Sequence, residues 1–204
     1  MTGKLLWWSL FSSVLIWSGI APKDGLTWFL EVLPALIGGA FIAWSYRALP
    51  LTPLLQILIL IHCIILMVGG HYTYAEVPLF DWLRDAFDMQ RNNYDKLGHF
   101  AQGFVPAILA REILIQKQVL SSPVWRNYFI LCICLSFSAF YELIEWWVAL
   151  LSSEAADAFL GTQGYIWDTQ SDMLWALCGA IAALLTLSKL HSRQLSGLSP
   201  RGAR

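Results

Sequence analysis

The chain has 204 residues, of which 57% are hydrophobic and only 13% are charged, whereas an ordinary soluble domain carries roughly 25% charged residues. The formal net charge is −1, and the basic residues are dispersed, so the chain lacks the basic patch that holds a nucleic-acid backbone. The composition argues against a soluble enzyme or a nucleic-acid binder and predicts one membrane-embedded domain.

Six apolar segments are candidates for membrane-spanning helices, each of which needs about 20 residues to cross a bilayer core of roughly 30 Å. They cover residues 5–21, 27–46, 51–70, 98–116, 127–151 and 171–189. The first follows Lys4 and resembles a signal peptide, but the spans after it favour a retained helix. The fourth is the weakest, because Gln102, Arg111 and Glu112 are costly in hydrocarbon.

We therefore expect an all-α polytopic membrane protein with about six transmembrane helices. Residues 1–190 form a single transmembrane domain, and residues 191–204 form a polar cytoplasmic tail that we expect to be disordered. The Lys and Arg residues of the connections divide eight to four between the two sides, which predicts that both termini are cytoplasmic. The inner side has Lys4, Arg47, Lys117, Arg126, Lys189, Arg193, Arg201 and Arg204, and the outer side has Lys23, Arg84, Arg91 and Lys96.

Two outer connections are longer and more polar than the others. The first covers residues 71–96, and its stretch 80–87 is suited to a short interfacial helix. The second covers residues 152–170 and contains Glu154, Asp157 and Asp168 without a basic residue. Its turn-rich stretch 161–164 could turn backbone amides towards an anionic head group.

Polar side chains of three predicted helices converge near the outer side. Spacings of three, four or seven residues place side chains on one helical face. The predicted topology puts these faces of the three helices at the same depth in the membrane. The residues are Asp95, His99 and Gln102 on the fourth helix, Glu142 and Glu145 on the fifth, and Asp168 and Asp172 on the sixth, with Glu31 and His71 on the same side.

Several carboxylates cannot all remain ionised side by side in a low dielectric, so they must be protonated, paired with cations or bound to a metal. We expect Asp95, His99, Glu142 and Asp172 to act as acid–base or catalytic groups. The candidate ligands of a divalent metal ion are Asp95, His99, Glu142, Glu145, Asp168 and Asp172. The chain has no P-loop, GxGxxG, HExxH or CxxC motif and no Ser-centred nucleophile elbow.

Structural interpretations of the same residues stay open. Asp95, Asp168 and Asp172 are suited to lie in water at helix N-termini, where the helix dipole favours acidic groups. Arg111 and Glu112 are suited to a structural ion pair, or Arg111 to reaching the inner surface. His62, alone on an apolar helix, is expected to be a packing residue.

Three sequence stretches, 94–104, 141–146 and 161–173, resemble the YjdF-like family of uncharacterised bacterial inner-membrane proteins. The resemblance covers all six predicted spans and implies a multi-pass protein of the inner membrane. Asp95, Lys96, His99 and Phe100, then Glu142, then Asp172 and Gly179, more distantly resemble the DKxxHF, glutamate and DxxxNxxG elements of VanZ-like proteins. Ala176 stands where that last element has asparagine, so the site of VanZ-like proteins does not carry over in full.

Two classes of function follow from these residues. The first is binding or transport of a cation or a lipid at an outward-facing acidic and histidine site. The second is a metal- or acid–base-assisted enzyme that acts on a lipid or a lipid-linked envelope substrate. A purely structural role is the third possibility. The expected partners are membrane lipid and a lipid-linked or ionic ligand, with no nucleic acid.

Overall fold

The computed structural model describes residues 2–151 and 163–198, and every regular element within them is helical, as the sequence predicts. The elements are α1 (Thr2–Gly19), α2 (Gly25–Ala48), α3 (Pro53–Tyr72), η1 (Tyr74–Glu76), α4 (Pro78–Ala86), α5 (Tyr94–Gln116), α6 (Pro123–Leu151) and α8 (Asp168–Gly197). Each predicted apolar segment corresponds to one long helix, and α4 corresponds to the predicted interfacial helix. The stretch that contains Glu154 and Asp157 lies outside the described residues.

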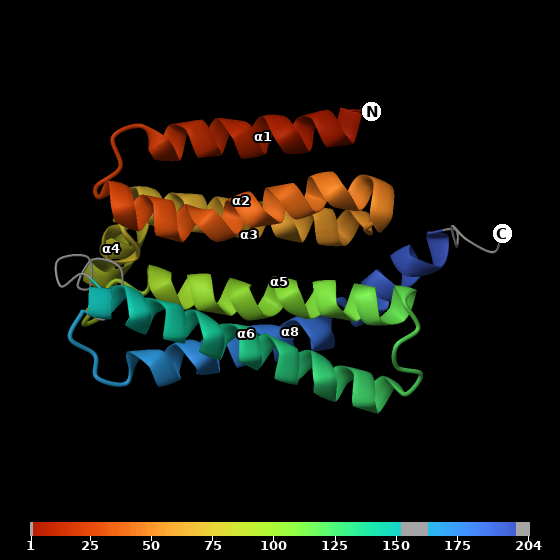
Figure 1. Ribbon diagram of the computed structural model, residues 1–204. Coiled ribbons are helices and arrows are strands. Elements are labelled where there is room, and N and C mark those ends of the chain that lie inside the picture. Colours follow the sequence, from red (N-terminus) through yellow and green to blue (C-terminus); the bar gives the residue numbers. More distant parts are fainter. Residues whose placement is uncertain (1, 152–162, 199–204) are drawn as a thin grey trace.

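The long helices α1, α2, α3, α5, α6 and α8 run side by side, and the short α4 lies across one end of the bundle (Figure 1). The start of α1 and the end of α8 lie at the opposite end (Figure 1). Helix α5 packs against α3, α6 and α8, and α3 in turn packs against α1 and α2. Four helices, α2, α3, α6 and α8, are long and apolar enough to cross a membrane by length and composition. The arrangement with six spans and cytoplasmic termini stays a prediction.

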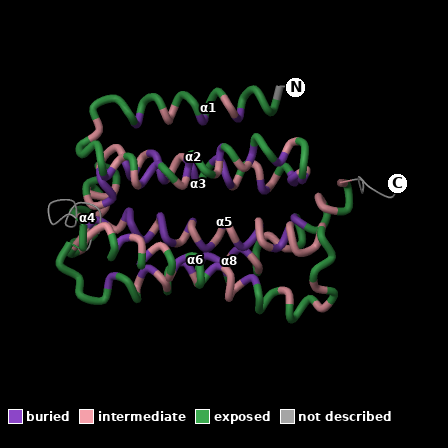
Figure 2. Tube along the Cα trace, viewed as in Figure 1, coloured by how far each residue is buried: buried purple, intermediate pink, exposed green. Residues whose placement is uncertain are grey.

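Helix α5 is the polar helix of the bundle, and its neighbours shield it. Its charged residues Asp95, Lys96, Arg111 and Glu112 are all buried, and buried positions recur along the whole helix in Figure 2. Leucine 185 on α8, by contrast, is 80% exposed, as expected for a side chain that faces lipid. The polar composition that made this segment the weakest candidate is therefore compatible with a central helix, because its charges face protein rather than hydrocarbon.

Helices α5 and α8 cross with their backbones in direct contact. A Cβ atom at Gly103 would stand 1.7 Å from the carbonyl oxygen of Ala176, and one at Gly179 would stand 2.0 Å from that of Phe100. Only glycine fits at these two positions unless the helices separate. Small residues allow such close approach between membrane helices, and here the contact fixes the positions of the polar side chains on both helices.

A buried polar network joins α3, α5 and α8 at the end of the bundle where the chain starts and finishes. The Glu112 carboxylate accepts hydrogen bonds from the backbone N–H of Thr52 at 2.7 Å and its hydroxyl at 2.6 Å. Its Oε2 also lies 2.8 Å from His191 Nε2, while Arg111 donates to His191 Nδ1 at 2.8 Å. Because a guanidinium only donates, Nδ1 is the acceptor and Nε2–H donates to Glu112.

This network corrects two expectations from the sequence. Arg111 and Glu112 do not pair directly, since His191 bridges them. The segment after Lys189 is not disordered over its first residues, because α8 continues to Gly197 and His191 is fully buried. The local sequence does not indicate that this segment is helical, because the segment is simply polar. Its helical conformation depends on partners that are distant in the chain.

Candidate functional site

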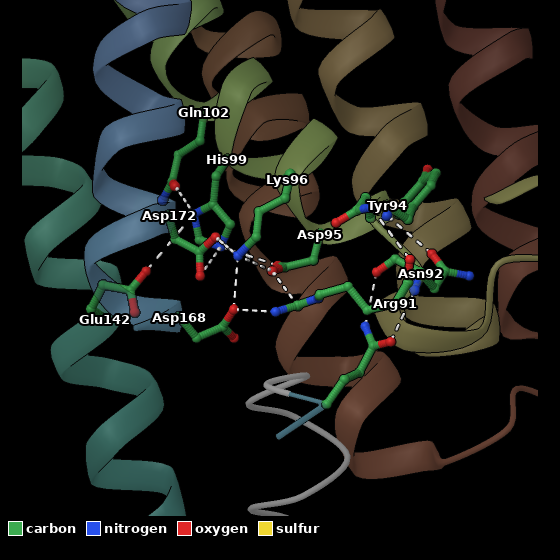
Figure 3. Close-up of polar contacts among 12 residues, drawn as sticks. Arg91, Asn92, Tyr94, Asp95, Lys96, His99, Gln102, Glu142, Asp168 and Asp172 are labelled. Atoms are coloured by element: carbon green, nitrogen blue, oxygen red, sulfur yellow. Dashed lines mark hydrogen bonds and ion pairs between the residues drawn. The ribbon is translucent and has the colours of Figure 1, made fainter. Parts of the chain in front are cut away.

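The polar residues predicted on α5, α6 and α8 lie at the end of the bundle that α4 covers. Figure 3 shows their side chains pointing towards one another from these three helices. Helix α5 contributes Asp95, Lys96, His99 and Gln102, α6 contributes Glu142, and α8 contributes Asp168 and Asp172. We call this set, together with Arg91, the outer cluster.

Asp168 is held by two basic residues and is not an exposed helix cap. Its Oδ1 accepts hydrogen bonds from Arg91 NH1 at 2.5 Å and from Lys96 Nζ at 2.8 Å (Figure 3), and the residue is only 6% exposed. Asp95 is buried as well, at 7% exposure. The interpretation of these two aspartates as solvated caps is therefore wrong. Both cations contact the same oxygen of Asp168, and its role as a metal ligand stays a prediction.

Asp95, His99 and Asp172 form the compact core of the outer cluster. Oδ1 of Asp95 lies 3.2 Å and Oδ2 of Asp172 lies 3.9 Å from Nε2 of His99. One potential ligand atom from each residue lies within 4.8 Å of the others. Ligands bound at about 2.1 Å to a tetrahedral ion lie about 3.4 Å apart, so the spacing suits a shared metal ion.

The second oxygen of each aspartate faces the basic residues. Asp172 Oδ1 accepts a hydrogen bond from Lys96 at 2.6 Å, and Asp95 Oδ2 lies 3.5 Å from both Lys96 Nζ and Arg91 NH2. Each carboxylate thus has one oxygen fixed by a permanent cation and one turned towards His99. Such outer contacts orient metal ligands and acid–base groups in proteins.

Gln102 fixes the orientation of the His99 ring. His99 Nδ1 lies 2.9 Å from Oε1 of Gln102, and an amide oxygen only accepts hydrogen bonds. The proton is therefore on Nδ1, and Nε2 faces the two aspartates. A bare nitrogen lone pair beside two carboxylates is unfavourable, so a proton or a metal cation must lie between them. The i, i+3 relation of the two residues on α5 explains their contact.

The two glutamates of α6 have different surroundings. Oε1 of Glu142 is 3.9 Å from His99 Nδ1 and is a buried oxygen without a hydrogen-bond partner among the described residues. Glu145 instead lines a small cavity of about 70 Å³. We call this the acidic cavity, and the described residues that line it are Glu31, Pro34, His62, Leu66, Tyr74, Asp95, Gly98, His99, Gln102, Tyr141 and Glu145.

Negative charge exceeds positive charge in this part of the protein. The outer cluster and the acidic cavity together contain six buried carboxylates, and the permanent cations in contact with them are Arg91 and Lys96. The carboxylates are those of Glu31, Asp95, Glu142, Glu145, Asp168 and Asp172. The interior of a protein does not tolerate this excess, so protons or bound cations must compensate for it.

Sequence reasoning missed several contributors. Arg91 was assigned only to a connection, and because it precedes the first residue of α5, helical spacing could not place it beside Asp95. His62, expected to be a packing residue, also lines the acidic cavity. His71, expected near the site, instead contacts the carbonyl oxygen of Ser18 at 3.0 Å.

The turn-rich stretch is only partly described. Residues 161 and 162 lie outside the described residues, and the Gln163 side chain pairs with the backbone of Asn92 through hydrogen bonds of 2.9 and 3.0 Å. Asn92 Nδ2 also donates to the Val77 carbonyl at 3.0 Å, so Asn92 connects Gln163, in the segment before α8, to the residue that precedes α4. The binding of an anionic head group there stays a prediction.

Fold and site together define a multi-helix membrane protein with a buried acid and histidine cluster at one end. The chain belongs to the family described as "Predicted membrane protein (DUF2238)", whose model matches residues 3–193. It is 50% identical to the inner membrane protein YjdF of Escherichia coli strain K12 over 182 residues, which cover 89% of this chain and 87% of that relative. No solved structure matches the chain.

The family match confirms the resemblance to YjdF-like proteins, and the relative places the chain in the bacterial inner membrane as a multi-pass protein. Neither match bears on the more distant resemblance to VanZ-like proteins, which stays a hypothesis. The roles of Asp95, His99, Glu142 and Asp172 as acid–base groups, and of the wider set as metal ligands, also stay predictions.

Proposed function

We propose that this inner-membrane protein binds a divalent metal cation through Asp95, His99 and Asp172. The observation that carries the proposal is the position of His99 Nε2, which faces Oδ1 of Asp95 at 3.2 Å and Oδ2 of Asp172 at 3.9 Å. Two carboxylates with one imidazole suit Mn²⁺, Fe²⁺ or Zn²⁺ better than a purely oxygen-binding ion. Glu142, whose Oε1 has no hydrogen-bond partner among the described residues, is available as a further ligand or as an acid–base group.

Proton and metal compete for the same nitrogen in this proposal. In the metal-free protein a proton on Nε2 separates His99 from the aspartates, and cation binding displaces that proton. Affinity for the metal therefore falls as the pH falls, by about tenfold per pH unit where one proton is released. A cation held at the outer side between α5, α6 and α8 is suited to binding and exchange, which is the function that we favour.

The test is elemental analysis of the purified full-length protein after equilibrium dialysis against MnCl₂. We expect His99→Ala and Asp172→Asn to lose one manganese equivalent, and Glu142→Gln to weaken its binding without unfolding the protein. Glu76→Gln is the matched control, because Glu76 is 54% exposed and pairs only with Lys23 among the described residues. Full manganese binding by both His99→Ala and Asp172→Asn would refute the proposal.

A groove beside Lys96 favours a second candidate function, in which the site acts on a lipid or a lipid-linked substrate. The groove has a volume of about 680 Å³ and lies between α4, α5 and α8, within the range of roughly 300–1,000 Å³ for ligand pockets. Arg91 and Lys96 line it together with aromatic residues such as Tyr165 and Trp175. A polar head group in this groove would lie next to the outer cluster.

Lipid that co-purifies with the protein tests this second candidate. We expect Trp175→Ala to lose bound phospholipid in native mass spectrometry. Trp125→Ala is the control, since Trp125 is exposed and lies at the start of α6. Equal lipid retention by the two variants would remove the groove as a lipid site.

A further inference from the structure

The acidic cavity is lined by Asp95 and His99 but not by Asp172, the third residue of the proposed metal set. It lies between α2, α3, α5 and α6, whereas Asp172 belongs to α8. Three carboxylates line it, those of Glu31, Asp95 and Glu145, and no Lys or Arg is among its described lining residues. Asp95 is the only one of the three that also belongs to the proposed metal set.

The carboxylates of Glu31 and Glu145 have no ion-pair partner among the described residues. Glu145 is 8% exposed and faces the cavity, yet no hydrogen bond or ion pair with a described residue holds its side chain. Glu31 is 5% exposed and has only uncharged tyrosine hydroxyls as donors among the described residues, those of Tyr74 and, at a long distance of 3.4 Å, Tyr141. Buried carboxylates in this state need a proton or a cation.

The cavity has room for more than a proton. A buried water needs about 10–15 Å³ of cavity volume, so the cavity of about 70 Å³ has room for several waters. Hard divalent cations such as Mg²⁺ are commonly bound through one or two carboxylates while they keep several waters. Glu31, Glu145 and the Tyr141 hydroxyl offer only oxygen atoms, which is the donor set that such cations take.

Charge balance gives a further argument, which rests on the cation of the proposed function and counts every carboxylate as ionised. Six buried carboxylates carry six negative charges, and Arg91, Lys96 and one divalent cation at His99 offset four of them. A second divalent cation offsets the remaining two and leaves the region neutral with an uncharged His99. Neutrality is the condition that a low-dielectric interior favours.

We propose that the acidic cavity binds a second, partly hydrated hard divalent cation between Glu31 and Glu145. This site goes beyond the proposed function, because neither glutamate belongs to the Asp95, His99 and Asp172 set. Asp95 connects the two sites, since it lines the cavity and also directs Oδ1 to His99. The outer end of the bundle is then a two-cation centre.

The experiment is equilibrium dialysis of the full chain in lipid nanodiscs against MnCl₂, with manganese per chain counted by elemental analysis. Wild-type protein binds two manganese ions, Glu31→Gln and Glu145→Gln each bind one, and Asp172→Asn keeps the cavity ion. The exposed Glu76→Gln control binds two. Tyr141→Phe removes only the hydroxyl and should lower the affinity for the second ion by about tenfold. This variant provides a test that does not depend on removing a charge.

The outcomes separate this inference from the proposed function. One manganese ion per chain, lost in Asp172→Asn but retained in Glu31→Gln and Glu145→Gln, would mean that the cavity carries protons, and the second site would be refuted alone. One ion that depends only on Glu31 and Glu145 would support the cavity site and refute the site at His99. Absence of manganese from a folded wild-type protein would refute both.

Discussion

Replacement of Gly103 by alanine should separate α5 from α8 and disturb the site without touching it. The new Cβ would stand 1.7 Å from the carbonyl oxygen of Ala176, whereas carbon and oxygen atoms in contact keep about 3.3 Å. The two backbones must therefore move apart locally by about 1.5 Å, since a carbonyl of a helix cannot rotate away as a flexible side chain does.

The expected cost follows from this displacement. Overpacking of a tight contact destabilises a protein by about 1–3 kcal/mol, and the higher helix propensity of alanine returns at most about 1 kcal/mol. His99 lies one turn from Gly103, and Asp172 lies one turn from Ala176, so their separation changes as well. A shift of this size exceeds the tolerance of about 0.2 Å in metal–ligand distances.

Thermal unfolding in nanodiscs and manganese titration measure the two effects. We expect Gly103→Ala to lower both the melting temperature and the affinity for manganese. Gly3→Ala is the control, because no atom lies within 4 Å of the position of its Cβ, and its melting temperature should stay at or slightly above that of the wild type. An unchanged melting temperature for Gly103→Ala would show that the backbones are not in contact as described.

Three further predictions concern the rest of the chain. Glu112→Gln should lower the melting temperature through a loss of about 3–5 kcal/mol, because it leaves the Arg111 charge buried without a counter-charge; a melting curve like that of the exposed control Glu76→Gln would contradict the role of this network. At the start of α2, Asp24 accepts a hydrogen bond from the Thr27 backbone N–H at 2.7 Å, which lowers the pKa of its carboxyl group. The stability from this cap is present above the usual pKa of aspartate, about 3.9, and is lost as the pH falls through the lowered pKa. Asp24→Asn should therefore flatten the fall of the melting temperature at acidic pH. Asp24→Ala should cost about 1 kcal/mol of stability at neutral pH. For topology, a reporter active only in the cytoplasm should work at the C-terminus and one active only outside should work near Asp157, and the reverse pattern would overturn the orientation.

The sequence by itself determined the class of protein and the local grouping of its polar residues. Long apolar segments with few charges have no stable alternative to helices in a membrane, because their backbone groups must be satisfied internally. The spacing of Asp95, His99 and Gln102 put them on one face of α5, since helical periodicity is a local property. The same argument placed Asp168 and Asp172 together at the start of α8.

Only the tertiary structure decided which of these faces meet. Long apolar helices with few polar residues have little in their local sequence that specifies rotation about the helix axis, so the split between Glu142 beside His99 and Glu145 in the acidic cavity was not predictable. Nor was the contact of His191 with Glu112, which lie 79 residues apart. Direct backbone contact at Gly103 and Gly179 fixes how α5 lies on α8, and this packing turns separate polar stripes into one site.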